Sequence, residues 1–290
     1  MRARPFGRAL GPAGCSLVAA LLVRLPLAGA VASPRTPPVV DLHVDLSYRV
    51  GYGGGTLGGG SGQYVASRLR AGNVVGVVLP LFVPKRVAPE GPRASDFDAS
   101  FERLISLIPR TPPYALPGCK APDSVRPGGG GEHVVRTWLS FEGAGPLAAD
   151  KDSVLRWAAR GVRIFGLVHT WDNALATSSG NATPSATGLT DTGREFVARV
   201  FAAGGLVDVS HASDASTDEV LGLAARAGKP VFATHSNARA VTPHPRNLTD
   251  DQIRAIAATG GIIGVNFHSR FLTSEGRARV ADVVRHVLHL

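Results

Sequence analysis

Seven apolar stretches rich in β-branched residues recur along the chain, and most of them are continuously apolar. Strands buried on both faces of a sheet have this pattern. The predicted strands are Val39–Asp45, Val74–Val83, Arg136–Glu142, Val162–His169, Leu206–His211, Pro230–His235 and Gly261–Phe267. We therefore expect a sheet that other elements cover on both sides.

Segments in which apolar residues recur at helical spacing lie between these strands. The predicted helices are Gln63–Ala71, Asp96–Ile108, Ser153–Arg160, Asp191–Ala203, Ala215–Ala227 and Thr249–Thr259, and the pattern continues in Ser274–Leu290. Strands alternating with helices are typical of a parallel sheet. The sequence thus predicts an α/β fold, a (β/α)8 barrel of the TIM type in which the eighth strand is missing.

Residues 1–32 differ in composition from the rest of the chain. Three arginines precede the apolar stretch Cys15–Val23, and small residues follow at Ala30 and Ala32. This order predicts a signal peptide over residues 1–32 and a secreted or periplasmic location for one barrel domain over residues 33–290. No apolar run is long enough to span a membrane.

Charge and cysteine content narrow the classes of partner. The net charge of +9 falls to +5 without the four arginines of the leader, and no basic run is interleaved with aromatic residues. Nucleic acid is therefore not an expected partner. Of the two cysteines, Cys15 lies in the leader, so Cys119 would have no intramolecular disulfide partner after cleavage.

Residues that bind metals stand at the ends of five predicted strands. They are His43 with Asp45, Glu142, His169, His211 and His235. Alternate side chains of a strand point to the same side, so His43 and Asp45 could share one cation. The carboxyl ends of barrel strands form a single face, where these side chains are expected to converge.

Imidazole and carboxylate ligands together suit zinc or a similar divalent cation. Four histidines and two carboxylates exceed what one tetrahedral zinc needs, so the pattern favours two Zn²⁺ ions bridged by Glu142. Two such ions can hold a hydroxide between them and polarise a substrate carbonyl. His268 is a further candidate for this face. His133, His244, His286 and His289 are expected to be hydrogen-bonded surface residues.

Several motifs in this order resemble the renal or membrane dipeptidase family. The segment Asp41–Asp45 resembles its opening His-x-Asp motif, while Leu206–His211 and Thr234–Arg239 resemble its fifth-strand and sixth-strand motifs. Pro245–Asp250 and Gly260–Phe267 resemble further conserved blocks of the family. The resemblance runs from about Val39 to Phe267.

This resemblance implies a zinc-dependent dipeptidase of the amidohydrolase superfamily. One zinc would be bound by His43 and Asp45 and the other by His211 and His235, with Glu142 as the catalytic bridge. The resemblance also gives His169 a catalytic role in contact with the substrate, at the developing oxyanion. Arg246 would bind the free C-terminal carboxylate of a small dipeptide. A homodimer is left open.

The family's eighth strand carries an aspartate that accepts a proton from the bridging water, and nothing after Phe267 resembles its motif. We therefore expect a C-terminally incomplete barrel that is poorly soluble and at best weakly active. Two alternatives to a dipeptidase remain. One is another two-metal amidohydrolase acting on N-acyl amino acids or lactones, and the other is a metal-binding but inactive fragment.

Overall fold

The computed structural model describes residues 37–52, 57, 64–108, 113–116, 133–181 and 187–290. The predicted signal peptide and Cys119 lie outside these residues. The leader, the domain boundary at residue 33 and the secreted location therefore stay predictions. Among the described helices, none combines the length and the apolar composition that crossing a bilayer requires.

The strands form one eight-stranded sheet in which every pairing is parallel. They are β1 (Val39–Asp41), β2 (Val74–Leu81), β3 (Tyr114–Ala115), β4 (Val135–Glu142), β5 (Val162–Gly166), β6 (Leu206–Asp208), β7 (Val231–Ala233) and β8 (Ile262–Ile263). Their order is β1-β2-β4-β5-β6-β7-β8, and β3 pairs with β4 outside this path. The predicted α/β barrel class is confirmed. In the residues described, β1 pairs only with β2 and β8 only with β7, so the sheet is open between β1 and β8.

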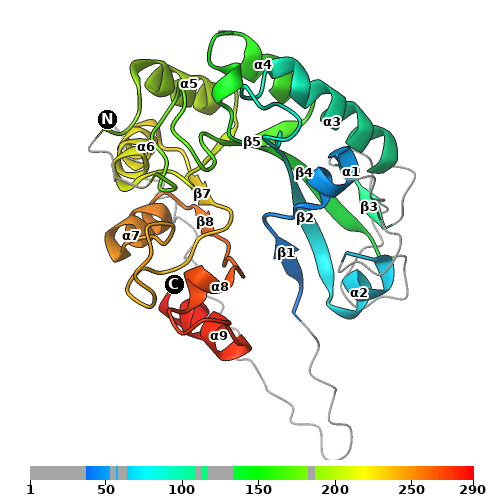
Figure 1. The fold of residues 1–290 in the computed structure, drawn as a ribbon, viewed down its shortest axis with the longest axis vertical. Helices are drawn as coiled ribbons and strands as arrows, with labels where there is room; N and C mark the ends of the chain where they lie inside the picture. The colour runs from blue at the N-terminus through cyan, green and yellow to red at the C-terminus, as the bar shows by residue number, and fades with distance from the viewer. Residues whose placement is uncertain (1–36, 53–56, 58–63, 109–112, 117–132, 182–186) are drawn as a thin grey trace, which may run out of the picture. The chain divides into compact units, whose positions relative to one another are not determined.

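Most of the described helices lie between successive strands, and α8 and α9 follow β8. The helices are α1 (Leu46–Tyr52), α2 (Ala66–Ala71), α3 (Ala94–Leu107), the 3₁₀ helix η2 (Gly145–Leu147), α4 (Ser153–Ala159), α5 (Asp191–Ala202), α6 (Asp214–Ala227), α7 (Asp250–Ala258), α8 (Ser269–Leu272) and α9 (Val280–His289). Figure 1 shows α3 to α7 along the outer side of the strands. The sequence did not predict α1 and α8, because seven and four residues are too few for a recognisable helical period.

Aromatic packing fixes the carboxyl end of β4. The ring of Phe141 lies 4.9 Å from the rings of Phe97 in α3 and Trp157 in α4, edge-on to both. Phe141 is fully buried. Neighbouring residues in a strand point to opposite faces, so packing Phe141 beneath α3 and α4 directs Glu142 to the other face of the sheet.

Most strands end earlier than the sequence predicts. β1 stops at Asp41 and β5 at Gly166, and the predicted strand Gly261–Phe267 is reduced to Ile262–Ile263. Isolated hydrogen bonds continue the ladder beyond the strand ends. In one of them, the Val209 N–H donates to the Phe232 carbonyl over 2.8 Å. The histidines expected at strand ends therefore lie on loops just beyond the strands.

Candidate metal centre

The carboxylate of Glu142 lies among four imidazole rings. Its Oε1 lies 3.1 Å from Nε2 of His211, 3.5 Å from that of His43, 3.6 Å from that of His235 and 3.7 Å from that of His169. The Glu142 side chain is only 8% exposed, so water screens these contacts little. The structure thus brings the four strand-end histidines of the sequence analysis to one carboxylate oxygen.

His43 and Asp45 reach this cluster from a turn. β1 ends at Asp41, and the Asp45 carbonyl accepts a hydrogen bond from the Arg49 N–H at the start of α1. Asp45 Oδ1 nevertheless lies 3.7 Å from His43 Nε2, with the Asp45 side chain 71% exposed. The predicted alternation along a strand is therefore wrong, because the chain already turns into α1, although the two side chains do approach each other.

Two sets of three donors in the described residues could each hold a metal ion. One set is His43, Glu142 and His235, the other is Glu142, His169 and His211, and the ligand atoms within each set lie within 4.8 Å of one another. Both sets share Glu142. The grouping separates His211 from His235, which the resemblance to membrane dipeptidases implied would share one zinc, and it includes His169 and omits Asp45.

The spacing of the donors fits a divalent cation. Zinc bonds of about 2.0–2.1 Å in a tetrahedral arrangement place neighbouring ligand atoms about 3.3 Å apart. The distances from Glu142 Oε1 to the histidine nitrogens lie around this value. His211 Nε2 and His235 Nε2 lie 2.8 Å apart, and two such nitrogens need a proton or a cation between them.

The backbone of His211 has a conformation that few non-glycine residues adopt. Its φ angle is 70°, in the left-handed region. The carbonyl of His211 accepts hydrogen bonds from the Ser179 N–H at 2.8 Å and from the Ser178 hydroxyl at 3.2 Å. These bonds hold a turn that faces the ring toward Glu142, and such strain is common where a side chain must be aimed at a site.

The cluster favours an ionised carboxylate beside neutral imidazoles. Burial alone would raise the pKa of Glu142, but the charge of His43 and the hydrogen bond from His211 hold that pKa well below its usual range. Burial and the charge of Arg246 lower the pKa of His211 to about 3. Burial, followed by His43, lowers the pKa of His235 well below its usual value. Neutral imidazole and ionised carboxylate are the forms that bind metals.

His43 has the opposite shift. Burial would lower its pKa, but Glu142 and then Asp45 outweigh burial and raise it. In the metal-free protein, His43 is therefore the ring of the cluster that protonates most readily. A cation bound beside it would compete with that proton.

Arg246 brings a buried cation to the edge of the cluster. It is 7% exposed, its NH2 donates to the His235 carbonyl over 3.2 Å, and its backbone N–H donates to His244 Nδ1 over 3.1 Å. Among the described residues, its Nε has no hydrogen-bond partner. Burial lowers the pKa of Arg246 to about 10, so it stays charged at neutral pH. A buried guanidinium with an unused donor is suited to bind an anion.

Aromatic residues flank the cluster, and the sequence analysis did not single them out. The Phe82 ring, directly after β2, lies 4.6 Å from the His169 ring, and the Tyr48 ring lies 6.2 Å from Phe82. Phe82 lies within the apolar strand predicted over Val74–Val83 and Tyr48 within the short helix α1, so both resemble ordinary core sequence and no signal distinguished them. They form an apolar wall beside His169.

The remaining histidines occupy different environments. His268 is exposed, and its ring lies 4.6 Å from that of Phe271. His289 pairs with Asp250 over 2.9 Å. The expectation that His286 lies on the surface is wrong, because its side chain is fully buried.

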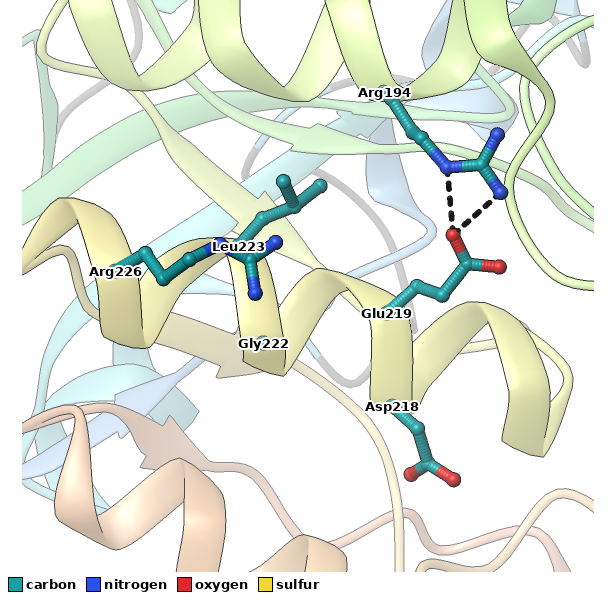
Figure 2. Close-up of a pocket in the computed structure, with 6 residues that line it drawn as sticks. All are labelled: Arg194, Asp218, Glu219, Gly222, Leu223 and Arg226. Atoms are coloured by element: carbon teal, nitrogen blue, oxygen red, sulfur yellow. Dashed lines mark hydrogen bonds and ion pairs between the residues drawn. The ribbon is translucent and has the colours of Figure 1, made fainter.

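A separate pocket of about 330 Å³ lies between α5 and α6 (Figure 2). It is lined by Arg194, Asp218, Glu219, Gly222, Leu223 and Arg226. Arg194 pairs with Glu219 Oε2 at 2.7 Å and 2.8 Å, so these two charges already neutralise each other. The pocket shares no residue with the histidine cluster, and its chemistry is that of a solvated ion pair, so we place the functional site at the cluster.

Comparison with known proteins identifies relatives of this fold. The metallopeptidase of Rhodobacter sphaeroides, whose crystal structure holds a phosphinate mimic of the dipeptide L-Ala-D-Ala, is 26% identical to this chain. The two superpose with a TM-score of 0.73 over 88% of this chain and 82% of that one.

Two curated relatives match over shorter stretches. An uncharacterized protein in the pqqA 5' region of Klebsiella pneumoniae is 36% identical over 55% of this chain and 60% of its own length. An uncharacterized dipeptidase of Schizosaccharomyces pombe is 29% identical over 54% of this chain and 38% of its own length. The chain thus spans less than two thirds of these relatives. The family model for membrane dipeptidases (peptidase family M19) matches residues 30–290, and the chain belongs to that family.

Proposed function

We propose that this chain is a metal-dependent dipeptidase whose centre is the cluster around Glu142. The observation that carries the proposal is the approach of four imidazole nitrogens to within 3.1–3.7 Å of one buried carboxylate oxygen. Buried titratable groups with strongly shifted pKa values, such as Glu142 and His211, are typical of functional sites. Family membership gives that site its class of reaction.

We assign two divalent cations, zinc by the chemistry of the donors, to this cluster. Glu142 would bridge them, and His43, Asp45, His211 and His235 would complete their shells. Bound there, the two cations would polarise the carbonyl of the scissile bond and lower the pKa of a water between them. The two donor sets that share Glu142 support two ions, and the second set groups His169 with His211.

Arg246 would orient the substrate. Its unpaired Nε and its buried charge suit the planar α-carboxylate of a dipeptide. This contact would set the distance between the carboxylate and the scissile bond, so longer peptides would not fit. The phosphinate mimic of L-Ala-D-Ala bound by the Rhodobacter relative supports a dipeptide of this size.

His169 would stabilise negative charge on the carbonyl oxygen. Its Nδ1 lies 2.9 Å from the Thr170 hydroxyl. If that hydroxyl donates to Nδ1, the ring proton stays on Nε2, the nitrogen that faces Glu142. The neighbouring Phe82 ring excludes water from one side, which strengthens such a hydrogen bond.

Turnover of L-Ala-D-Ala and L-Ala-L-Ala tests the proposal, with the protein stripped of metal and then reloaded with zinc. We expect turnover only after reloading. Reloaded protein that binds zinc and cleaves neither dipeptide would contradict the proposal. Under the same conditions, cleavage of N-acetyl-alanine or of a lactone in place of the dipeptides would assign the chain to another amidohydrolase activity.

A further inference from the structure

The hydroxyl of Thr234 lies between a buried carboxylate and a histidine of the cluster. Its Oγ1 lies 2.5 Å from Asp208 Oδ2 and 2.9 Å from His235 Nδ1. Asp208 and Thr234 are 5% and 2% exposed, so water does not compete for these hydrogen bonds. The three residues form a chain from the end of β6 to the loop after β7.

The direction of each hydrogen bond follows from the donors that are present. Asp208 Oδ1 accepts the backbone N–H groups of Ser210 at 2.9 Å and Thr234 at 3.0 Å, so Asp208 acts as an acceptor. Thr234 has a single hydroxyl proton. The nearest acceptor, and the charged one, is Asp208 Oδ2, so the proton points there.

The other contacts of Thr234 are consistent with this direction. Ser210 Oγ lies 3.5 Å from Thr234 Oγ1 and accepts the His235 N–H over 3.1 Å. Its hydroxyl proton is therefore free to point at Thr234. The Thr234 oxygen can then accept two hydrogen bonds, one from Ser210 and one from His235 Nδ1–H.

We propose that Thr234, held by Asp208, is a positioning residue that fixes the tautomer of His235. With its proton on Nδ1, His235 presents the lone pair of Nε2, which lies 3.6 Å from Glu142 Oε1 and 2.8 Å from His211 Nε2. Metal-binding histidines usually donate their second nitrogen directly to a carboxylate or a carbonyl, whereas here a hydroxyl is interposed. The inference rests on the proposed function in taking a metal as the partner of Nε2.

Three substitutions separate this role from simple packing. Thr234→Val keeps the shape and removes the hydroxyl, and Thr234→Ser keeps the hydroxyl. In Asp208→Asn, the two backbone N–H groups fix the amide oxygen at the Oδ1 position, so the amide nitrogen donates to Thr234. The Thr234 proton then points at His235 Nδ1 and moves the ring proton to Nε2. Thr137→Val is the control, because the buried Thr137 hydroxyl donates to the Val135 carbonyl on β4, away from the cluster.

The first readout is nitrogen NMR of His235 in the metal-free protein, at a pH where the ring is neutral. We expect the Nδ1–H tautomer in the wild type and in Thr234→Ser, and the Nε2–H tautomer in Asp208→Asn. An Nε2–H ring in the wild type, or an Asp208→Asn ring unchanged from it, would overturn the proposal. This readout requires neither metal nor activity.

The second readout is zinc affinity by calorimetry. We expect Thr234→Val and Asp208→Asn to bind about 10–100-fold more weakly than the wild type, as is typical when a partner of a metal ligand is lost. Thr234→Ser and Thr137→Val should stay close to the wild type. Wild-type affinity in Thr234→Val would overturn the proposal. If the wild type bound no zinc, the proposed function would be overturned instead. The tautomer of His235 measured by NMR would then be the test of the inference.

Discussion

His286 Nδ1 lies 3.1 Å from the backbone nitrogen of Ala238, 48 residues earlier in the chain. Its Nε2 lies 3.2 Å from the Leu272 carbonyl, so the ring accepts from Ala238 and donates to Leu272. The ring is fully buried. Helix α9 is thereby tied to the loop that follows β7 and carries both His235 and Arg246.

Replacing His286 with leucine should destabilise the protein. The Ala238 N–H would remain buried without a partner, which costs about 1–3 kcal/mol. The Leu272 carbonyl would keep its hydrogen bond from the Thr242 hydroxyl at 2.9 Å. Urea unfolding would measure the loss. His289→Leu, on the same helix, is the matched control, because it removes only a partly exposed pair with Asp250, worth at most about 1 kcal/mol. Equal losses in the two variants would contradict the role of His286.

Arg246→Ala should weaken the binding of dipeptides that have a free α-carboxylate by about 2–5 kcal/mol, as expected when one partner of a buried charge pair is truncated. The loss should appear mainly in KM. Arg246→Lys should recover only part of it, because an ammonium cannot replace the planar fork. A C-terminally amidated dipeptide should be a poor substrate for the wild type, and equal turnover of amidated and free dipeptides would refute the contact.

Glu142→Gln should abolish binding of at least one of the two cations. The amide keeps the size of the side chain but removes the negative charge at the centre of the four histidines. Metal content after dialysis against zinc would be measured by mass spectrometry. Glu219→Gln, which removes a carboxylate paired with Arg194 between α5 and α6, should retain the metal content of the wild type. Full zinc content in Glu142→Gln would place the site elsewhere.

Tyr114 should make the protein sensitive to alkali. Its hydroxyl donates to the Tyr64 carbonyl over 3.1 Å, and burial raises its pKa to about 12, against about 10 in an unfolded chain. The neutral phenol is favoured by the fold, so this stability is fully present below pH 10 and is lost as pH rises from about 10 to about 12. The slope reaches about 1.4 kcal/mol per pH unit.

Tyr114→Phe tests this pH dependence. The variant should lose about 1 kcal/mol at neutral pH with the hydrogen bond. Between pH 10 and pH 11.5, its free energy of unfolding should fall less steeply than that of the wild type. Parallel curves for the two proteins would show that Tyr114 ionises as freely in the folded chain as in the unfolded one.

The sequence predicted the parallel sheet because its strands are buried on both faces, which leaves a continuous apolar signal. It also predicted that a strand ends at Glu142, as β4 does. The direction of the Glu142 side chain became clear only from the packing of Phe141 on the opposite face. It could not predict where the strands end. That depends on loop hydrogen bonds, such as those that hold His211 at a φ of 70°.

The contacts around the metal ligands were harder to predict than the ligands themselves. Asp208 stands three residues before His211, and Thr234 stands directly before His235. Only the folded chain shows that Thr234 Oγ1 joins Asp208 to His235. His286 is similar. A histidine near the end of an amphipathic helix is expected at the surface, and its burial follows from the packing of α9 against the loop after β7.

Anomalous X-ray scattering at the zinc edge, from a crystal of the zinc-loaded protein, would locate the metal ions directly. We predict two peaks about 3.5 Å apart. Both should lie within about 2.0–2.3 Å of a Glu142 oxygen or of an Nε2 atom in the surrounding histidines. A map with no peak within that distance of Glu142, or with its peaks at other residues, would contradict the metal centre on which the proposed activity depends.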